Sequence, residues 1–299
     1  MYAIETEGLT KSFRGLRAVD GLSMHVPEGA VYGFIGENGS GKSTAEKLIC
    51  GQLVPDSGKM RLFGRDYRDP GVRMRVGALI ENAGCFPDST VQANMMMQAI
   101  NLGLKNPQED IGRALRTVRM DDNASLRFSK CSLGMKQRVG IAMALLGDPA
   151  LLILDEPING LDSDGMRIMR EVLWDVTKNM GATVLISSHI LGELEKVATH
   201  YGIIREGHML RELSAAEMGR RCKKAVSVKT ADNALAYSIL RQRYGDMQPV
   251  EGGIEVRGTD DAAEIVALLC AGGCRVREAK GRKVGLEEYY VSLMEGKEA

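Results

Sequence analysis

The chain alternates between short apolar runs and longer amphipathic stretches, which is the pattern of buried strands joined by crossover helices. Apolar runs of five or six residues occur at 30–35, 76–80, 150–154 and 182–187. Their continuity favours strands that are buried on both faces, as in a parallel sheet. Helical periodicity over 164–179 lies between the last two runs, so this part of the chain predicts a β-α-β unit.

Other patterns surround these buried strands. Strand-like alternation at 2–6 and 22–26, and a hairpin signal at 58–64, predict an antiparallel β subdomain. The segment from about 82 to 145 is mainly helical in its periodicity, which predicts a helical insertion. Two further strands between 201 and 213 complete this part of the chain.

The texture changes after residue 214. Short strand-like segments alternate with helix-like ones in the order β-α-β-β-α-β, and a last helix is expected near 286–295. We therefore expect two domains, at 1–214 and 215–299, the second a small α+β accessory domain. No motif specifies its role, and a regulatory or dimer-bracing role is a hypothesis.

Composition narrows the class of protein. Apolar residues make up 44% of the chain, enough for a sizeable core, and 39 basic residues balance 39 acidic ones, so charge does not indicate nucleic acid. The start of the chain lacks the pattern of a secretory signal, and no run reaches the ~18 apolar residues of a membrane span. We expect a cytoplasmic protein with reduced thiols, because its cysteines lack metal or redox spacing: Cys50, Cys85, Cys131, Cys222, Cys270 and Cys274.

A glycine-rich loop follows the run at 30–35 and precedes a helical segment. Its sequence, GENGSGKST, fits the phosphate-binding pattern, in which backbone N–H groups and a helix N-terminus surround phosphates. Within this pattern Lys42 reaches the terminal phosphates and Ser43 ligates Mg²⁺. The sequence therefore predicts a nucleotide phosphate chain with Mg²⁺ as the ligand of Gly36, Glu37, Asn38, Gly39, Ser40, Gly41, Lys42, Ser43 and Thr44.

Polar residues follow two of the other apolar runs. Asp155 and Glu156 end the run LLILDEP, where Asp155 would hold Mg²⁺ and Glu156 would act as general base toward a water. An acidic strand cap is the alternative reading of the pair. His189 ends the run VLISSH, where it would position the attacking water, although a histidine at a strand end is more often structural.

These motifs, taken in order, resemble the ATP-binding cassette family over residues 2 to about 214. In family terms GENGSGKST is the Walker A motif, LLILDEP the Walker B motif, NGLD (159–162) the D-loop and ISSH the switch-histidine loop. CSLGM (131–135) occupies the place of the family signature. The resemblance implies a P-loop NTPase core with a parallel sheet, and ATP hydrolysis coupled to transport through a separate integral membrane permease.

The resemblance also assigns residues to a composite site. Ser132 and Gly134 of the signature would face the γ-phosphate bound by a second copy, and Asp162 lies in the D-loop, so the resemblance implies a dimer, most simply a homodimer. The local reading of Ser132 as an ordinary helix N-cap is compatible with this role. Phe13 matches the aromatic that stacks on adenine, and core packing is the alternative for it.

Several positions depart from the family pattern. Leu133 and Met135 replace a glycine and a glutamine of the signature, and Ile158 stands where threonine is common. Glu81 occupies the place of a glutamine near Mg²⁺ and the attacking water, so a catalytic and a metal-binding role are carried over to it. The glutamate and the SLGMK signature resemble the branch that exports bacitracin-like and lantibiotic peptides for self-protection.

The resulting hypothesis is an exporter ATPase that lies on the inner face of the membrane through its permease. The Met-rich segment 89–104 is a candidate docking surface, although methionines of an insertion core are an equal alternative. A soluble or regulatory cassette, acting on ribosomes or DNA, is the competing class. Such proteins commonly carry tandem cassettes or a long coiled coil, and this sequence has neither pattern.

Overall fold

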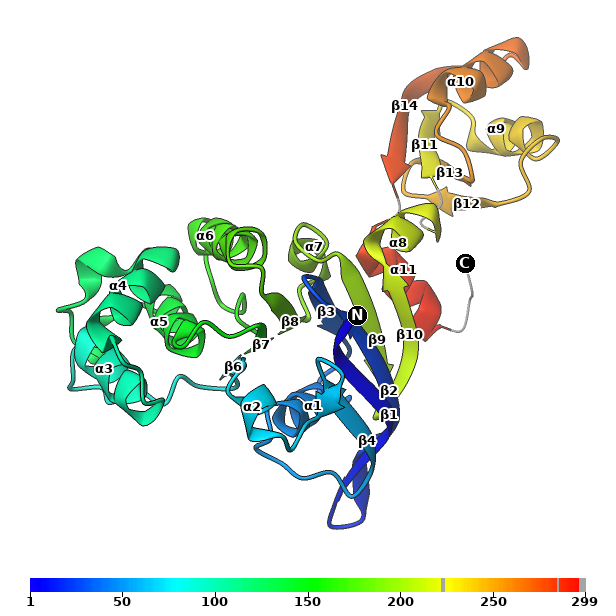
Figure 1. The fold of residues 1–299 in the computed structure, drawn as a ribbon. Helices are drawn as coiled ribbons and strands as arrows, with labels where there is room; N and C mark the ends of the chain where they lie inside the picture. The colour runs from blue at the N-terminus through cyan, green and yellow to red at the C-terminus, as the bar shows by residue number, and fades with distance from the viewer. Residues whose placement is uncertain (222–223, 284, 296–299) are drawn as a thin grey trace. The chain divides into compact units, whose positions relative to one another are not determined.

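Hydrogen-bonded strands form three sheets in the computed structural model, which describes residues 1–221, 224–283 and 285–295. The chain divides into one unit of Met1–Ala215 and a second of Ala216–Ala299. The first two sheets belong to the first unit, and the third sheet belongs to the second unit (Figure 1).

A six-stranded sheet in the order β10-β9-β3-β8-β7-β6 forms the centre of the first unit. All its neighbouring strands are parallel except β10, which runs antiparallel to β9. The predicted apolar runs form the middle strands, because helices cover both faces of such a sheet and leave little room for polar side chains. The strands are β3 (Val31–Ile35), β6 (Val76–Leu79), β7 (Leu151–Asp155), β8 (Thr183–Ser187), β9 (His200–Arg205) and β10 (His208–Ser214).

An antiparallel sheet in the order β2-β1-β4-β5 packs beside it. Buried side chains of both sheets, among them Ile4, Met24, Phe34 and Ile153, belong to one hydrophobic core with the inner face of the first helix. The strands are β1 (Tyr2–Phe13), β2 (Leu16–Pro27), β4 (Ser57–Leu62) and β5 (Arg65–Asp66).

Helices α3, α4 and α5 form one lobe in the interval between β6 and β7 (Figure 1). No helix among the described residues combines the length and apolar character that crossing a membrane requires. The helices of the first unit are α1 (Lys42–Ile49), α2 (Pro70–Arg73), α3 (Val91–Asn101), α4 (Pro107–Thr117), η1 (Asp121–Asn123), η2 (Phe128–Lys130), α5 (Leu133–Leu145), α6 (Ser163–Trp174), the π-helical η3 (Asp175–Asn179) and α7 (Leu191–Leu194), and α8 (Ala215–Arg221) crosses the unit boundary.

The second unit contains an antiparallel sheet in the order β12-β13-β11-β14. Its strands and first two helices follow one another as β-α-β-β-α-β, the predicted order, and its core includes Val226, Leu240, Ile254 and Leu269. Its elements are β11 (Lys224–Thr230), α9 (Asn233–Leu240), β12 (Met247–Val250), β13 (Gly253–Arg257), α10 (Ala262–Ala271), β14 (Val276–Lys283) and α11 (Leu286–Met294).

The described cysteines are all free thiols, and they differ in exposure. Cys131 is buried and Cys85 is half-buried, whereas Cys270 is exposed. Burial, and next the neighbouring Cys131, raise the pKa of the Cys85 thiol to about 11. Burial also raises the pKa of Cys131. The sixth cysteine, Cys222, lies outside the described residues.

These environments predict an order of alkylation. At about pH 8 iodoacetamide should modify Cys270 at least about 10-fold faster than Cys85 or Cys131, because the thiolate is the nucleophile and the half-buried Cys85 and the buried Cys131 have raised pKa values. The rate at Cys85 should climb as the pH is raised toward its pKa of about 11. Site-resolved mass spectrometry measures each rate, with unfolded protein as the control. Equal rates at Cys85 and Cys270 in folded protein would contradict this assignment.

Candidate functional site

The phosphate loop joins β3 to α1 and needs glycine at two places. A Cβ on Gly36 would lie 2.5 Å from Ser40 Oγ, and one on Gly41 would lie 2.3 Å from the carbonyl oxygen of Ala18. Gly41 also has φ +105°, a backbone conformation that other residues rarely adopt. The loop therefore keeps a narrow curve that no side chain interrupts.

This curve is rich in hydrogen-bond donors. The Lys42 side chain is buried, and its Nζ donates to the carbonyl oxygens of Gly36 at 2.7 Å and Glu37 at 3.0 Å, so the ammonium lies across the loop. The first amides of α1 have no carbonyl partner within the helix. The buried Ser40 hydroxyl has no hydrogen-bond partner among the described residues. A phosphate chain of a nucleotide would satisfy these donors, so the loop fits ATP.

A serine links the two acidic residues that follow β7. Because β7 and β8 are parallel with Asp155 opposite Ser187, the Ser187 hydroxyl donates to Asp155 Oδ1 at 3.0 Å. The Glu156 N–H donates to the same hydroxyl at 3.2 Å. Glu156 has φ +49°, which is uncommon outside glycine and is often found at functional sites. The two hydrogen bonds of Ser187 and the backbone conformation of Glu156 therefore hold Asp155 and Glu156 in defined positions.

The structure brings Glu156 and His189 together, as both predicted catalytic roles require. His189 Nδ1 is hydrogen-bonded to Glu156 Oε2 at 2.8 Å, and the His189 N–H donates to the same oxygen at 3.4 Å. Both side chains are partly exposed at the carboxyl ends of β7 and β8. This edge of a parallel α/β sheet is where ligands bind.

The predicted metal ligands lie on elements that meet at this edge. Ser43 is in the first turn of α1, and Asp155 ends β7. Among the described residues no group of three or more His, Cys, Asp or Glu side chains converges as a metal site. Phosphate-loop enzymes hold Mg²⁺ with a hydroxyl, one aspartate, phosphate oxygens and waters, so Ser43 and Asp155 fit this ion without such a group.

Glu81 is exposed and paired with a residue of α1. It follows β6 with φ +61°, and its exposed carboxylate forms an ion pair with Lys47 of α1 at 2.5 Å. The ion pair attaches the segment after β6 to the helix of the phosphate loop. Its contribution to the metal site and to hydrolysis stays a prediction.

The signature and the D-loop pack against each other in a separate cluster. Ser132 caps α5, with its Oγ accepting from the Met135 N–H at 3.3 Å, and Asp162 caps α6 through the Gly165 N–H at 2.8 Å. The Leu133 side chain lies within 2.9 Å of the Cβ position of Gly160. No hydrogen bond or ion pair between described residues joins this cluster to the phosphate loop.

In the described part of the chain, Ser132, Gly134 and Asp162 thus make no hydrogen bond to the phosphate loop, whereas the D-loop adjoins the Walker B motif through the Asn159 N–H, which donates to the Glu156 carbonyl oxygen at 3.1 Å. Phe13, the predicted adenine contact, is exposed on the β1–β2 hairpin with Lys11 Nζ 5.6 Å from its ring centre. This exposure argues against the core-packing alternative, and stacking on adenine stays a prediction.

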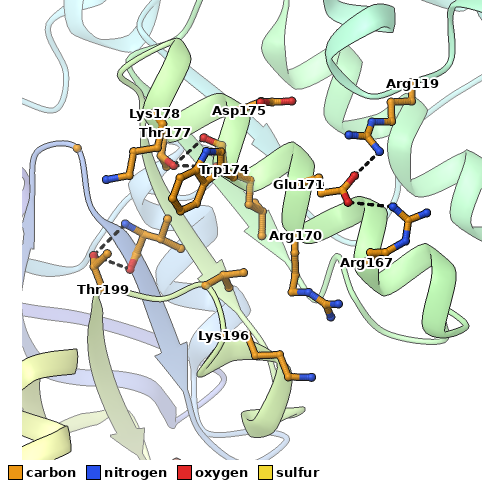
Figure 2. A pocket seen from close by; sticks show the side chains of 14 residues that line it. Arg119, Arg167, Arg170, Glu171, Trp174, Asp175, Thr177, Lys178, Lys196 and Thr199 are labelled. Carbon is orange, nitrogen blue, oxygen red and sulfur yellow. Dashed lines mark hydrogen bonds and ion pairs between the residues drawn. The ribbon is translucent and has the colours of Figure 1, made fainter.

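The sequence analysis missed two features. One is Ser187, which lies inside the ISSH motif and bridges the two acidic residues. The other is a cavity of about 740 Å³ at the start of β3, the end of the strand away from the phosphate loop. It lies beside α6 and the exposed Trp174 (Figure 2). Glu171 lies there between Arg119 and Arg167, with which it forms ion pairs. None of the predicted site residues lines this cavity.

Comparisons with known proteins match this geometry. The family model described as "ABC transporter" matches residues 19–159. The bacitracin transport ATP-binding protein BcrA of Enterococcus faecalis is 35% identical over 99% of this chain and 97% of its own length. The lantibiotic transport ATP-binding protein SrtF of Streptococcus pyogenes is 36% identical over 70% of this chain and 90% of its own.

A solved structure has the same fold. It is the dimeric post-hydrolysis state of the ATP-binding cassette MJ0796 bound to ADP and Pi, with a TM-score of 0.65 and 20% identity over 71% of this chain and 98% of that one. The predicted fold class, a P-loop NTPase core, is confirmed. The ordered motifs, the glycine-lined phosphate loop and the near full-length identity to a curated relative lead to one conclusion: the chain belongs to the ABC transporter family, as an ATP-binding protein and an ATPase.

Proposed function

We propose that this chain is the ATP-hydrolysing subunit of an exporter that moves antimicrobial peptides or drugs out of the cell through a separate permease. The class of exported molecule is inferred from the 35% sequence identity to a bacitracin transport ATP-binding protein, because the matched region extends over both units. The lantibiotic relative supports the same class over 70% of the chain. Nothing observed favours the alternative of a soluble or regulatory cassette.

Hydrolysis follows from the groups at the carboxyl edge of the central sheet. Lys42 and the amides of the phosphate loop bind the phosphates of ATP, and Mg²⁺, held by Ser43 and Asp155, neutralises their negative charge when it is bound. The Glu156 carboxylate accepts the proton of the attacking water. His189 shares a hydrogen bond with that carboxylate and therefore keeps it aimed while contacting the γ-phosphate.

Dimerisation follows from the separate cluster of signature and D-loop. The N-terminus of α5, with Ser132 and Gly134, presents unpaired amides and the positive end of the helix dipole. In a twofold dimer these groups bind the γ-phosphate held by the partner, so each ATP lies between two copies. Asp162 enters the same interface from the D-loop.

Docking to the permease is assigned to the surface beside Glu81 and α3. Within the segment that follows Glu81 in the chain, Phe86, Met97 and Ile100 are exposed by 61%, 36% and 66%, whereas Met95 is fully buried. The Met-rich segment therefore contains both core and surface side chains, and its docking role stays a prediction. This exposed apolar surface suits a short permease helix, and the chain is peripheral on the inner face of the membrane through it.

The Glu156→Gln variant should trap ATP between two copies. An amide cannot accept the water's proton, so the closed state persists, and size-exclusion chromatography with light scattering should show a dimer with ATP and Mg²⁺. Lys42→Ala in the same background should stay monomeric because it loses the phosphate contact. Tight ATP binding by a persistently monomeric Glu156→Gln chain would exclude the composite site.

His189→Ala should lower kcat for ATP hydrolysis about 10²–10³-fold while leaving ATP affinity nearly unchanged. The reason is that the histidine orients Glu156, whereas Lys42 and the amides of the phosphate loop supply most of the contacts that hold the nucleotide. Steady-state ATPase assays and nucleotide titrations measure the two quantities. His208→Ala, at an exposed histidine beside Asp20, is the control and should retain activity. An unchanged kcat in His189→Ala would remove the histidine from the mechanism.

Ile100→Asp should uncouple the chain from its permease. A carboxylate cannot enter an apolar contact, so stimulation of ATPase activity by the permease in vesicles should be lost, and the isolated chain should keep its basal rate. Val54→Asp, which changes an equally exposed apolar side chain outside the insertion, should leave stimulation intact. Normal stimulation of Ile100→Asp would place the docking surface elsewhere.

A further inference from the structure

Glu46 is a buried acid that the motifs do not explain. It lies on α1 one turn after Ser43, on the face that packs against the central sheet, and its exposed fraction is 0%. No hydrogen bond of ordinary geometry joins either of its carboxyl oxygens to a described residue, although the Ser187 hydroxyl and the Asp155 carboxylate lie beside them. Glutamate is almost never fully buried unless it is paired, so this residue requires a reason.

Its surroundings are apolar on one side and catalytic on the other. Ala45, Leu48 and Ile49 of the same helix are buried, and an apolar residue at position 46 would continue this face. The charged or polar groups near the Glu46 carboxyl are Asp155, Ser187 and Lys42. Burial, and next the Asp155 carboxylate, raise the pKa of Glu46 well above its ordinary value. Because it is fully buried and makes no hydrogen bond of ordinary geometry with a described residue, the carboxyl is an unfavourable choice for packing alone.

The position of these neighbours indicates what the carboxyl faces. Ser43 and Asp155 are the residues that fit Mg²⁺, and Ser187 donates to Asp155 at 3.0 Å. Glu46 lies one helical turn below Ser43 and beside Asp155, so it approaches the same place from the interior. Mg²⁺ dehydrates reluctantly and usually keeps several waters, which need acceptors.

We propose that Glu46 is a positioning residue of the Mg²⁺ site, whose carboxyl accepts hydrogen bonds from the ion's water shell and fixes the ion against Asp155. The inference rests on the proposed function, because it concerns the metal used in ATP hydrolysis. It assigns to Glu46 a role of the kind that outer partners of metal ligands have, and such partners commonly contribute 10- to 100-fold in metal affinity.

Mn²⁺ binding in the presence of ATP tests the proposal. The Glu156→Gln chain provides the background, since ATP is then not consumed, and electron paramagnetic resonance reports free Mn²⁺. Glu46→Met keeps the length of the side chain and removes both oxygens. It should weaken Mn²⁺ about 10- to 100-fold while ATP affinity in EDTA stays the same. Glu46→Gln, which keeps one acceptor oxygen, should restore part of the affinity.

Two controls separate this role from a purely structural one. Thr183→Val replaces another buried polar residue at the opposite end of β8 and should leave Mn²⁺ affinity unchanged. Glu46→Leu repeats the test with a second apolar side chain if the methionine variant does not fold. Unchanged Mn²⁺ affinity in a folded apolar variant overturns the proposal, and so does an equal loss in Thr183→Val.

The proposal and the function on which it rests fail in different ways. A chain that forms the ATP-dependent dimer and shows the same Mn²⁺ affinity with Glu46 or Met at this position overturns only the role of Glu46. A chain that binds no ATP in EDTA overturns the proposed function itself.

Discussion

The parallel pairing of β7 with β8 is the constraint on which the site depends. Its register sets Asp155 opposite Ser187, and one hydroxyl then joins the side chain of Asp155 to the backbone of Glu156. A shift of one residue would turn every side chain of β7 to the other face and disconnect the acids from the phosphate loop.

The site also depends on unusual backbone conformations in the phosphate loop and at Glu156. The phosphate loop can curve around a phosphate because Gly36 and Gly41 have no side chain that would meet Ser40 or Ala18. After the end of β7, a positive φ at Glu156 turns its carboxylate toward His189. Conformations of this kind are unfavourable for most residues, so the surrounding sheet has to hold them.

Much of the architecture and of the site could be predicted from the sequence, since both follow from local patterns. Continuous apolar runs marked the buried strands, and the phosphate loop and the residues that follow the strands marked the groups that lie at the carboxyl edge of the central sheet, where hydrolysis is proposed. The prediction did not extend to Glu46, because the segment AEK looks like the solvent-facing part of an amphipathic helix and only tertiary packing shows that its carboxyl is buried. The ion pair of Glu81 with Lys47 was missed for a similar reason, since it joins residues on separate elements.

Methionines of the insertion show the same limit. Met95 belongs to the core and Met97 to the surface, yet they stand two positions apart in one run. Helix geometry places them on different faces, and the faces are defined only once α4 and α5 have packed. A pattern of residue types can predict that a helix forms. It is less able to predict which face of that helix packs against the rest of the protein.

Arg119 joins α5, which begins at the signature, to α6, which follows the D-loop. Its carbonyl oxygen accepts a hydrogen bond from Arg138 of α5 at 2.9 Å, and its guanidinium pairs with Glu171 of α6. The signature begins α5, and the D-loop precedes α6. A rotation of the helical lobe would therefore reach α6 through Arg119, in addition to the direct packing of Leu133 against Gly160. The ion pair is half-exposed and easily broken, so the joint transmits small rotations and releases under large ones.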